Sequence, residues 1–379
     1  MRTTADRPTP AGLVLRALST LGPAPRSVIA THARLSPATV TSATRYLLEA
    51  GLIVETGAGP DTPRVGRPHT PLTLNTETTV AAIHFAAART RVAVVDISGE
   101  VLSSEIIPHR STDGAELVAH ATDALARVID SLPAEVAPRA LGAATGGWVD
   151  SAAGIVHSHP FLNWEGVRVS DQARGIVHSE QLFGALPAES SALVLFVGNV
   201  IDAAFAVDGR VRYGPGASAG SLEALVGSAL PGGIGSMRSL THHSLCEELS
   251  QQGLLPRPVP SFVDVVAAAR LDARVRARLV ERAGVLARVV AVLVDILNPD
   301  TVIIPDSSFT LIDEVRTAYL TGIAEHSTTI LDAQSLVTGT SFPGRILEQS
   351  AAAAVLRALY DDPLQFIAHT GSTLQPDLF

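Results

Sequence analysis

Residues 192–213 read ALVLFVGNVIDAAFAVDGRVRY, and this stretch decides the fold of most of the chain. It contains two apolar runs, each long enough for a buried strand. Asp208-Gly209 follows them, a dipeptide typical of tight hairpin turns. The third segment, Arg210 to Tyr213, predicts a short returning strand. The pattern as a whole predicts a meander of three antiparallel strands.

The same pattern occurs earlier in the chain. Residues 80–103 read VAAIHFAAARTRVAVVDISGEVLS, which again gives two apolar runs, a turn at Ser98-Gly99 and a third strand. Each copy continues with helical segments and one more buried strand, over 140–144 and 301–305. Two tandem units of this kind predict an α/β body of the actin-like, sugar-kinase (ribonuclease H-like) architecture, with ligands binding between its two lobes.

The N-terminal residues predict three helices. Apolar side chains at helical spacing indicate helices over 11–21 and 26–33. A third helix begins at Ser36-Pro37, because serine is a good N-cap and proline is tolerated at the first helical position. Gly51 ends this helix, since glycine adopts the left-handed conformation of a helix cap.

Two short strands complete the N-terminal unit. They are expected at 52–55 and 71–75, and the loop between them is rich in glycine, proline and arginine. Three helices followed by such a hairpin predict a winged helix-turn-helix. The alternative is a small helical domain with ordinary surface arginines, but the local charge argues against it.

Charge is divided unevenly along the chain. All 28 basic residues are arginine, against 37 acidic residues, and the formal net charge is −9. Residues 1–75 carry eight arginines and four acidic residues, whereas the remainder carries 20 arginines and 33 acidic residues. A basic head on an acidic body indicates that only the head meets a polyanion.

The third helix and the predicted wing are the expected DNA-binding surface. Short hydroxyl side chains can approach phosphates and base edges, and arginine can reach guanine or phosphate. A glycine between two arginines lets a loop follow the DNA backbone or enter a minor groove. We expect DNA contacts from Ser36, Ala38, Thr39, Thr41, Ser42 and Arg45 on the helix and from Arg64, Gly66 and Arg67 in the wing.

Composition excludes several other classes of protein. A chain that is 46% hydrophobic and 17% charged is not disordered. A single cysteine, Cys246, excludes a disulfide framework and a cysteine-rich zinc site. No apolar run reaches the ~18 residues of a membrane span, and the N-terminus has no apolar signal core, so we expect a cytoplasmic protein.

The combination of a winged helix-turn-helix with this duplicated body resembles the transcriptional-regulator branch of the ROK family (repressors, open reading frames and sugar kinases). The resemblance covers nearly the whole chain, and its most specific parts are residues 35–40, 66–68 and 72–75. Further parts are residues 96–99, 146–150, 154–156 and 294–299. It implies a dimer or higher oligomer that binds operator DNA, and often a body that senses a sugar or sugar phosphate.

The resemblance also implies a division into domains. We expect a winged helix-turn-helix over 1–75, a first actin-like lobe over 76–190 and a second lobe over 191–379, with the C-terminal helix returning toward the cleft.

The kinase equipment of the family is largely missing. Its Asp-x-Gly-x-Thr phosphate loop corresponds to residues 84–88, His-Phe-Ala-Ala-Ala, and its Asn-Asp pair with the catalytic base corresponds to Ser179-Glu180. A phosphate cradle needs free N–H groups and close backbone approach, which alanine obstructs. Glutamate carries its carboxylate one methylene further out, and a misplaced catalytic group is costly. We therefore expect a pseudo-kinase body with no catalytic residue and no cofactor.

The zinc and sugar site of the family is also incomplete. Residues 219–224 replace its Glu-x-Gly-His segment. His242, His243 and Cys246 lie at near-helical spacing without a fourth ligand, which is a weak zinc signal, and we expect no metal.

Some residues still line the expected cleft and could contact an effector, sugar-derived or more apolar. Trp164 would offer a stacking face, although a place in the core fits it equally well. The expected effector-binding residues are His84, Asn163, Trp164, Glu180 and Glu223.

The sequence thus favours a DNA-binding transcriptional regulator, a repressor, whose body forms a homodimer and senses a small molecule. Two alternatives stay open. One is a sugar kinase-like enzyme with a vestigial head, and the other is a regulator whose body serves only as an oligomerisation scaffold.

Overall fold

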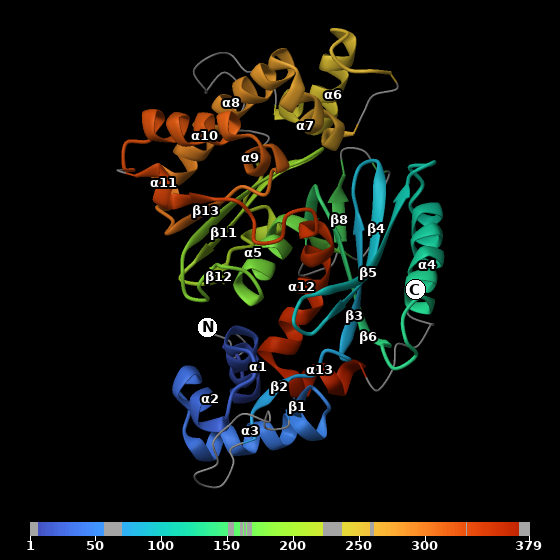
Figure 1. Cartoon of the computed structure of the whole chain (residues 1–379), viewed down its shortest axis with the longest axis vertical. Coiled ribbons are helices and arrows are strands. Elements are labelled where there is room, and N and C mark those ends of the chain that lie inside the picture. The colour runs from blue at the N-terminus through green and yellow to red at the C-terminus, as the bar shows by residue number, and fades with distance from the viewer. Residues whose placement is uncertain are drawn as a thin grey trace.

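The computed structural model of the 379-residue chain describes residues 7–56, 70–150, 155–159, 162, 164, 169–222, 237–257, 261–330 and 332–370. The molecule is elongated. Figure 1 shows the N-terminal helices at one end, the two sheets in the middle, and helices of the second lobe, among them α6, α7, α8 and α10, at the other end.

The N-terminal head has the helices and the strand pair expected of a winged helix-turn-helix. Ser36 is the N-cap of the third helix and accepts a hydrogen bond from the Thr39 N–H, and Gly51 has a φ of +70°. The elements are α1 (Pro10–Leu21), α2 (Arg26–Ala33), α3 (Pro37–Glu49), β1 (Ile53–Glu55) and its antiparallel partner β2 (Leu72–Leu74). Residues 57–69, which contain the predicted wing, lie outside the described residues.

The first sheet confirms the predicted meander. Its strand order is β5-β4-β3-β6-β9, in which the first three strands are antiparallel and the last two run parallel to β3. The strands are β3 (Thr79–Phe85), β4 (Arg89–Asp96), β5 (Val101–Pro108), β6 (Pro138–Thr145) and β9 (Ser170–Asp171). Beside the sheet lie α4 (Gly114–Asp130), the hairpin of β7 (Trp148–Asp150) with β8 (Ile155–Ser158), and α5 (Gln172–Leu182).

The second sheet repeats the first. Its order is β12-β11-β10-β13-β14, again an antiparallel meander continued by two parallel strands. Its strands are β10 (Ala192–Val197), β11 (Ile201–Val207), β12 (Arg210–Val211), β13 (Thr301–Ile303) and β14 (Val337–Thr338). Its helices are η2 (Pro215–Ala217), η4 (Met237–Leu240), α6 (His242–Gln251), α7 (Phe262–Leu271), α8 (Ala273–Leu297), α9 (Ser307–Leu311), α10 (Asp313–His326) and α11 (Ala333–Leu336). This repetition confirms the predicted actin-like body.

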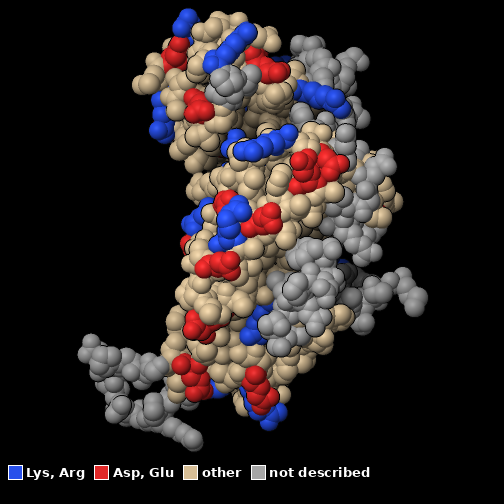
Figure 2. Space-filling view, turned by 90° about the vertical axis from the view of Figure 1, so that its right-hand side faces the viewer, with Lys and Arg blue, Asp and Glu red and all other residues tan. Residues whose placement is uncertain are grey.

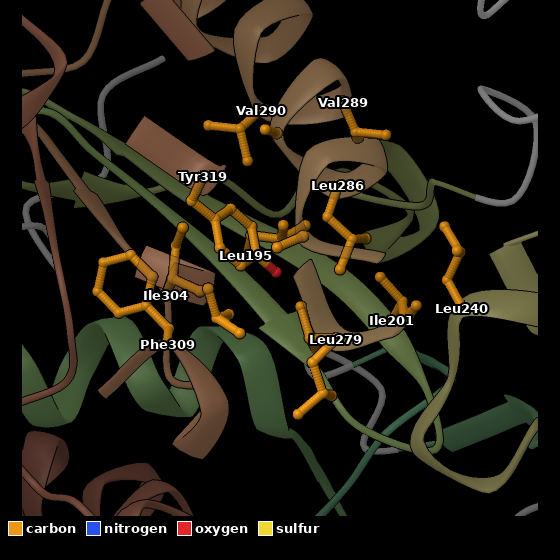
Figure 3. Packing of buried hydrophobic residues seen from close by; sticks show 14 of the residues in the cluster. Leu195, Ile201, Leu240, Leu279, Leu286, Val289, Val290, Ile304, Phe309 and Tyr319 are labelled. Carbon is orange, nitrogen blue, oxygen red and sulfur yellow. The ribbon is translucent and has the colours of Figure 1, made fainter. Parts of the chain in front are cut away.

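The core of the second lobe lies between its sheet and α8. Figure 3 shows Tyr319 and Phe309 beside Leu195 of the sheet, with Leu286 of α8 above them. The rings of Tyr319 and Phe309 meet edge to face at 5.6 Å, a favourable aromatic geometry.

Asp272 separates the helices α7 and α8. It has extended backbone angles, and its side chain caps α8 by accepting from the Arg274 N–H. Further along α8, Arg282 is 4% exposed, and its guanidinium lies 3.1 Å from the buried Asp306 carboxylate.

The C-terminal helix α12 (Ile346–Asp361), followed by α13 (Pro363–Thr370), packs against α1, α5, β3 and β6. Three glycines face its backbone. A Cβ atom at Gly12, Gly142 or Gly175 would overlap a carbonyl oxygen of Tyr360, Ala351 or Ser350, respectively. The backbones of the head, the first sheet and α5 therefore all contact the α12 backbone, with no side chain between them.

The head is docked onto this helix. The Thr9 N–H and hydroxyl both donate to the Asp361 carbonyl, at 2.8 and 3.2 Å, and Arg16 lies 2.6 Å from the Asp361 carboxylate. Apolar side chains of α1 and α3 share one buried cluster with α12 and the first sheet. This continuity of buried apolar surface holds the head and the first lobe together.

Among the helices that the structure describes, none has the length and apolar character needed to cross a membrane.

Replacing Gly142 by alanine should lower the free energy of unfolding by about 1–3 kcal/mol, since the added methyl group must displace the α12 backbone. Gly284→Ala is the matched control. No atom of the described residues lies within 4 Å of a Cβ atom there, and the same change inside a helix should raise stability by about 0.5–1 kcal/mol. Urea unfolding midpoints measure both changes, and a Gly142 variant as stable as the control would contradict the close packing of α12.

Candidate functional site

The exposed side of α3 is the first candidate site. Ser36, Ala38, Thr41, Ser42 and Arg45 are exposed, and Thr39 is half-buried. Three of the hydroxyls are occupied within the helix: Ser36 and Thr39 pair at 2.7 Å, and Thr41 donates to the Pro37 carbonyl. These bonds leave the side chains of Ser42 and Arg45 directed outward without a partner among the described residues. Arg64, Gly66 and Arg67 lie outside those residues.

Arg34, which the sequence analysis did not select, adds to this surface. It occupies the left-handed region (φ 54°) in the turn between α2 and α3, and its side chain is exposed. An arginine at the turn of a helix-turn-helix is well placed to contact a phosphate. The signal that could have found it is its position immediately before the Leu35-Ser36-Pro37 helix start.

The second candidate site is a cavity of about 580 Å³ between the two lobes. The first lobe contributes Trp148 from β7 and Asp171 and Arg174 at the start of α5, and the second lobe contributes the β10–β11 turn, residues 217–222 and the start of α6. Its described lining is Gly147, Trp148, His159, Asp171, Arg174, 199–203, 217–222, Met237, Arg238, Thr241, His243 and Ser244.

Arg174 holds one wall of this cavity in place. It is 4% exposed, and one of its terminal nitrogens donates to the carbonyls of Ala217 and Ala219, at 2.6 and 2.9 Å. The other lies 3.7 Å from the Asp171 carboxylate. Burial raises the pKa of Asp171 above its ordinary value, and the nearby Arg174 guanidinium opposes this shift. The wall formed by residues 217–219 of the second lobe is thus bonded to α5 of the first.

Trp148 is the aromatic side chain that faces the cavity. It is 49% exposed, its indole N–H donates to the Gly216 carbonyl at 3.0 Å, and its ring lies against His157 at a centroid distance of 4.7 Å. A half-exposed indole held at its edge leaves one ring face for a flat or apolar ligand. The sequence pattern did not single out Trp148, because the exposure of this side chain depends on the β7–β8 hairpin.

Trp164 lies elsewhere. It is 2% exposed, packs edge to face with Phe85 at 4.6 Å, and belongs to the apolar cluster beneath α4. The structure therefore places Trp164 in the core and not on the cavity wall, since a side chain buried against Phe85 offers no stacking face.

Of the other expected effector residues, the two that the structure describes, His84 and Glu180, have separate partners. His84 is buried, pairs with the Gln172 side chain at 2.7 Å, and has a pKa lowered to about 4 by burial. Glu180 is buried as well, and its carboxylate accepts from the Thr340 hydroxyl and from the N–H and hydroxyl of Ser341 at 2.6–2.9 Å. It lines a separate cavity of about 150 Å³. Asn163 and Glu223 lie outside the described residues.

The three residues of the weak zinc signal, His242, His243 and Cys246, do not form a common ligand set. The His242 ring stacks on Phe262 at 3.4 Å, whereas His243 pairs with Glu247 at the cavity. Burial raises the pKa of the Cys246 thiol to about 11, which disfavours the thiolate that binds metals. Within the described ranges, no three His, Cys, Asp or Glu side chains form a group that could hold a metal ion.

Three arginines in the first turns of α8 are paired with acidic residues. They are Arg274 with Asp272, Arg276 with Glu314, and Arg278 with Glu248, all within 3.2 Å. Figure 2 shows arginines and acidic residues interspersed along one face of the molecule. Mixed charge of this kind does not attract a polyanion strongly.

Comparison with known proteins gives relatives over nearly the whole chain. The chain is 30% identical to "Transcriptional regulator Rv0485" of Mycobacterium tuberculosis, over 96% of this chain and 88% of the relative. It is 25% identical to the "DNA-binding transcriptional dual regulator NagC" of Escherichia coli, over 77% of this chain and 78% of the relative. No protein-family model matches the sequence.

Solved structures show the same fold. A ROK family transcriptional regulator, a homolog of the E. coli MLC protein, superposes with a TM-score of 0.72 at 21% identity, covering 95% of this chain and 97% of the other. A ROK family glucokinase from Streptomyces griseus superposes with a TM-score of 0.61 at 16% identity, covering 72% and 98%. The chain therefore shares the fold of both proteins, and the match to the regulator covers more of the chain than the match to the kinase.

The two tryptophans of the chain give a direct test of the cavity geometry. The Trp164→Phe variant keeps only the half-exposed Trp148, so acrylamide should quench its fluorescence strongly. The Trp148→Phe variant keeps only the buried Trp164 and should be quenched several times less. Equal quenching in the two variants would contradict the assignment of Trp148 to the cavity and of Trp164 to the core.

Proposed function

This chain belongs to the ROK family of transcriptional regulators, and we propose that it represses transcription by binding a specific operator as a homodimer. We propose further that a small molecule in the interlobe cavity changes this binding. Membership in the family makes the chain a DNA-binding regulator with a kinase-like body. The observation that carries the proposal is the exposed side of α3, where Arg45 and Ser42 stand outward on a head that is basic within an acidic chain.

The DNA contacts follow from this surface. Each protomer would place the N-terminal part of α3 in a major groove, and a two-fold dimer would match a two-fold-related operator. The proposed contacts are Ser36, Ala38, Thr39, Thr41, Ser42 and Arg45 on α3, Arg34 before it, and Arg64, Gly66 and Arg67 in the wing. The hydroxyls that are already hydrogen-bonded within the helix would contribute to DNA binding mainly through their position against the DNA. Arg45 would supply the strongest contact.

The body is proposed to bind a small molecule without catalysing a reaction on it. Glu180, at the position of the catalytic base by the family resemblance, is turned toward Thr340 and Ser341 and away from the 580 Å³ cavity. The turn between β3 and β4 consists of alanines where a kinase would hold phosphate. Measurable phosphorylation of a sugar by ATP would refute this part of the proposal.

The interlobe cavity is the proposed effector site. A relative at 25% identity is named "N-acetylglucosamine repressor", which describes that protein. In this chain the lining combines the Trp148 face and apolar side chains such as Leu222 and Met237 with charged groups that include Asp171 and Arg174. Such a lining suits a small molecule with an apolar or flat face and several polar groups, sugar-derived or more apolar.

Operator binding can be tested with DNA selected by the protein from fragments of its own genome. Arg45→Ala should weaken binding to the selected site by about tenfold or more and make the dependence on salt less steep, because a base or phosphate contact is lost. Arg274→Ala on α8 is the matched control, since it removes the same charge from an exposed side chain far from α3, and it should leave the affinity unchanged.

Recovery of a shared, two-fold-symmetric sequence at moderate salt would support the operator proposal. Equal affinities of the two arginine variants would refute the assignment of the contact to Arg45.

Effector binding can be tested by thermal-shift screening with metabolites. A ligand at about 100 times its Kd should stabilise the protein by about 2.7 kcal/mol, and Trp148→Ala should remove this shift. Ile106→Ala is the control, because it truncates an exposed apolar side chain on β5 outside the cavity lining. A hit that survives in the Trp148 variant would place the ligand elsewhere, and the absence of any hit would favour a body that serves only as a scaffold.

A further inference from the structure

A chain of polar contacts begins at the head. Arg16 of α1 lies 2.6 Å from one carboxylate oxygen of Asp361, and the other oxygen accepts from the Arg357 side chain at 3.2 Å. Asp361 ends α12, and Arg357 lies one turn earlier. The two arginines therefore share one carboxylate, so a shift of α1 along α12 must change the position of Arg357.

The contacts continue from α12 into α5 and the second lobe. Arg357 donates to the His178 ring at 2.6 Å, and the same ring nitrogen lies 3.1 Å from the Tyr213 hydroxyl. Burial, together with the Arg357 charge, lowers the pKa of His178 well below its ordinary value, so the ring is neutral and its Nε2 accepts from Arg357. His178 thus joins the C-terminal helix to Tyr213, which lies two residues after the β12 edge strand.

Tyr213 stands at the base of the loop that forms one wall of the cavity. Its carbonyl accepts from the Ala219 N–H at 3.1 Å, and its ring lies under the Arg174 guanidinium at 5.1 Å. Arg174 in turn donates to Ala217 and Ala219. A molecule that contacts residues 217–220 must therefore act on the hydrogen bonds that orient Tyr213.

The same loop contains several backbone conformations that favour glycine. Gly214, Gly216 and Gly220 have φ values of 69°, 64° and 97°, in the left-handed region. Ala217 also has a positive φ, 50°, which is strained for an alanine. The hydrogen bonds from Arg174 to Ala217 and Ala219 hold this strained segment, so a change in those bonds bears on its conformation.

We propose that the contacts Arg174–Tyr213–His178–Arg357–Asp361–Arg16 couple the state of the cavity wall to the position of α1, so that the body sets the position of the DNA-binding head. The proposal rests on the proposed function in one respect, that a ligand occupies the cavity. His178 and Arg357 are then positioning residues, which contact neither DNA nor ligand but fix the relation between them. Coupling energies carried by such networks correspond to about 2- to 30-fold changes in equilibrium constants.

Hydrogen–deuterium exchange on the full-length chain tests the coupling without DNA or ligand. Tyr213→Phe removes only the hydroxyl that meets His178. Amide exchange in the first turns of α1 should then quicken by about twofold or more, although α1 lies at the other end of the contact chain. Tyr319→Phe is the matched control, because its buried hydroxyl has no hydrogen-bond partner among the described residues and it lies in the same lobe as Tyr213.

Asp361→Asn, next to α1, is the positive control and should also quicken exchange in α1. Unchanged α1 exchange in the Tyr213 variant would overturn the proposal, whether or not the Asp361 variant responds. An equal response to Tyr319→Phe would overturn it too, since general loosening would then explain the effect. None of these outcomes bears on operator binding, which the selection experiment decides separately.

Discussion

Close contact between the backbone of α12 and three glycines is the constraint on which the arrangement of this molecule depends. Gly12 of the head, Gly142 of the first sheet and Gly175 of α5 each face an α12 carbonyl at a distance that leaves no room for a side chain. Packing at this distance is short-ranged and cannot slide gradually, because protein interiors are close-packed. Elements far apart in the sequence therefore take fixed positions around the last long helix of the chain (Figure 1).

This arrangement links the two candidate sites. The head is bonded to the end of α12, and α5, which packs along the same helix, supplies Asp171 and Arg174 to the cavity wall. A regulator needs its DNA-binding and ligand-binding parts to share at least one structural element that both can bias. In the proposed mechanism, α12 and α5 together are this shared element. A sugar kinase needs no such link. The shared fold is consistent with a change of role in which the cleft is kept but serves to control the head and not to catalyse a reaction.

Local patterns in the sequence predicted much of this fold. The Ser36-Pro37 helix start, the Asp208-Gly209 turn and the repeated apolar runs depend on neighbouring residues, and the structure has each of them. The exposures of Trp148 and Trp164, the burial of Arg282 against Asp306 and the docking of α1 on α12 depend on residues distant in sequence. Spacing and propensity carry no information about such partners, which is why the cavity lining could not be predicted from the sequence.

The head and the first lobe should behave as one body held by α12. Spin labels at Glu49→Cys on α3 and His120→Cys on α4 test this by double electron–electron resonance, with labelled chains diluted in unlabelled ones. Both positions are exposed, and the native Cys246 is buried. A protein with an unaltered Gly12 should give a single narrow distance distribution in the absence of DNA, and Gly12→Leu should broaden it by driving a side chain into the α12 carbonyls. A broad or multiple distribution with Gly12 in place would contradict the docking of the head on α12.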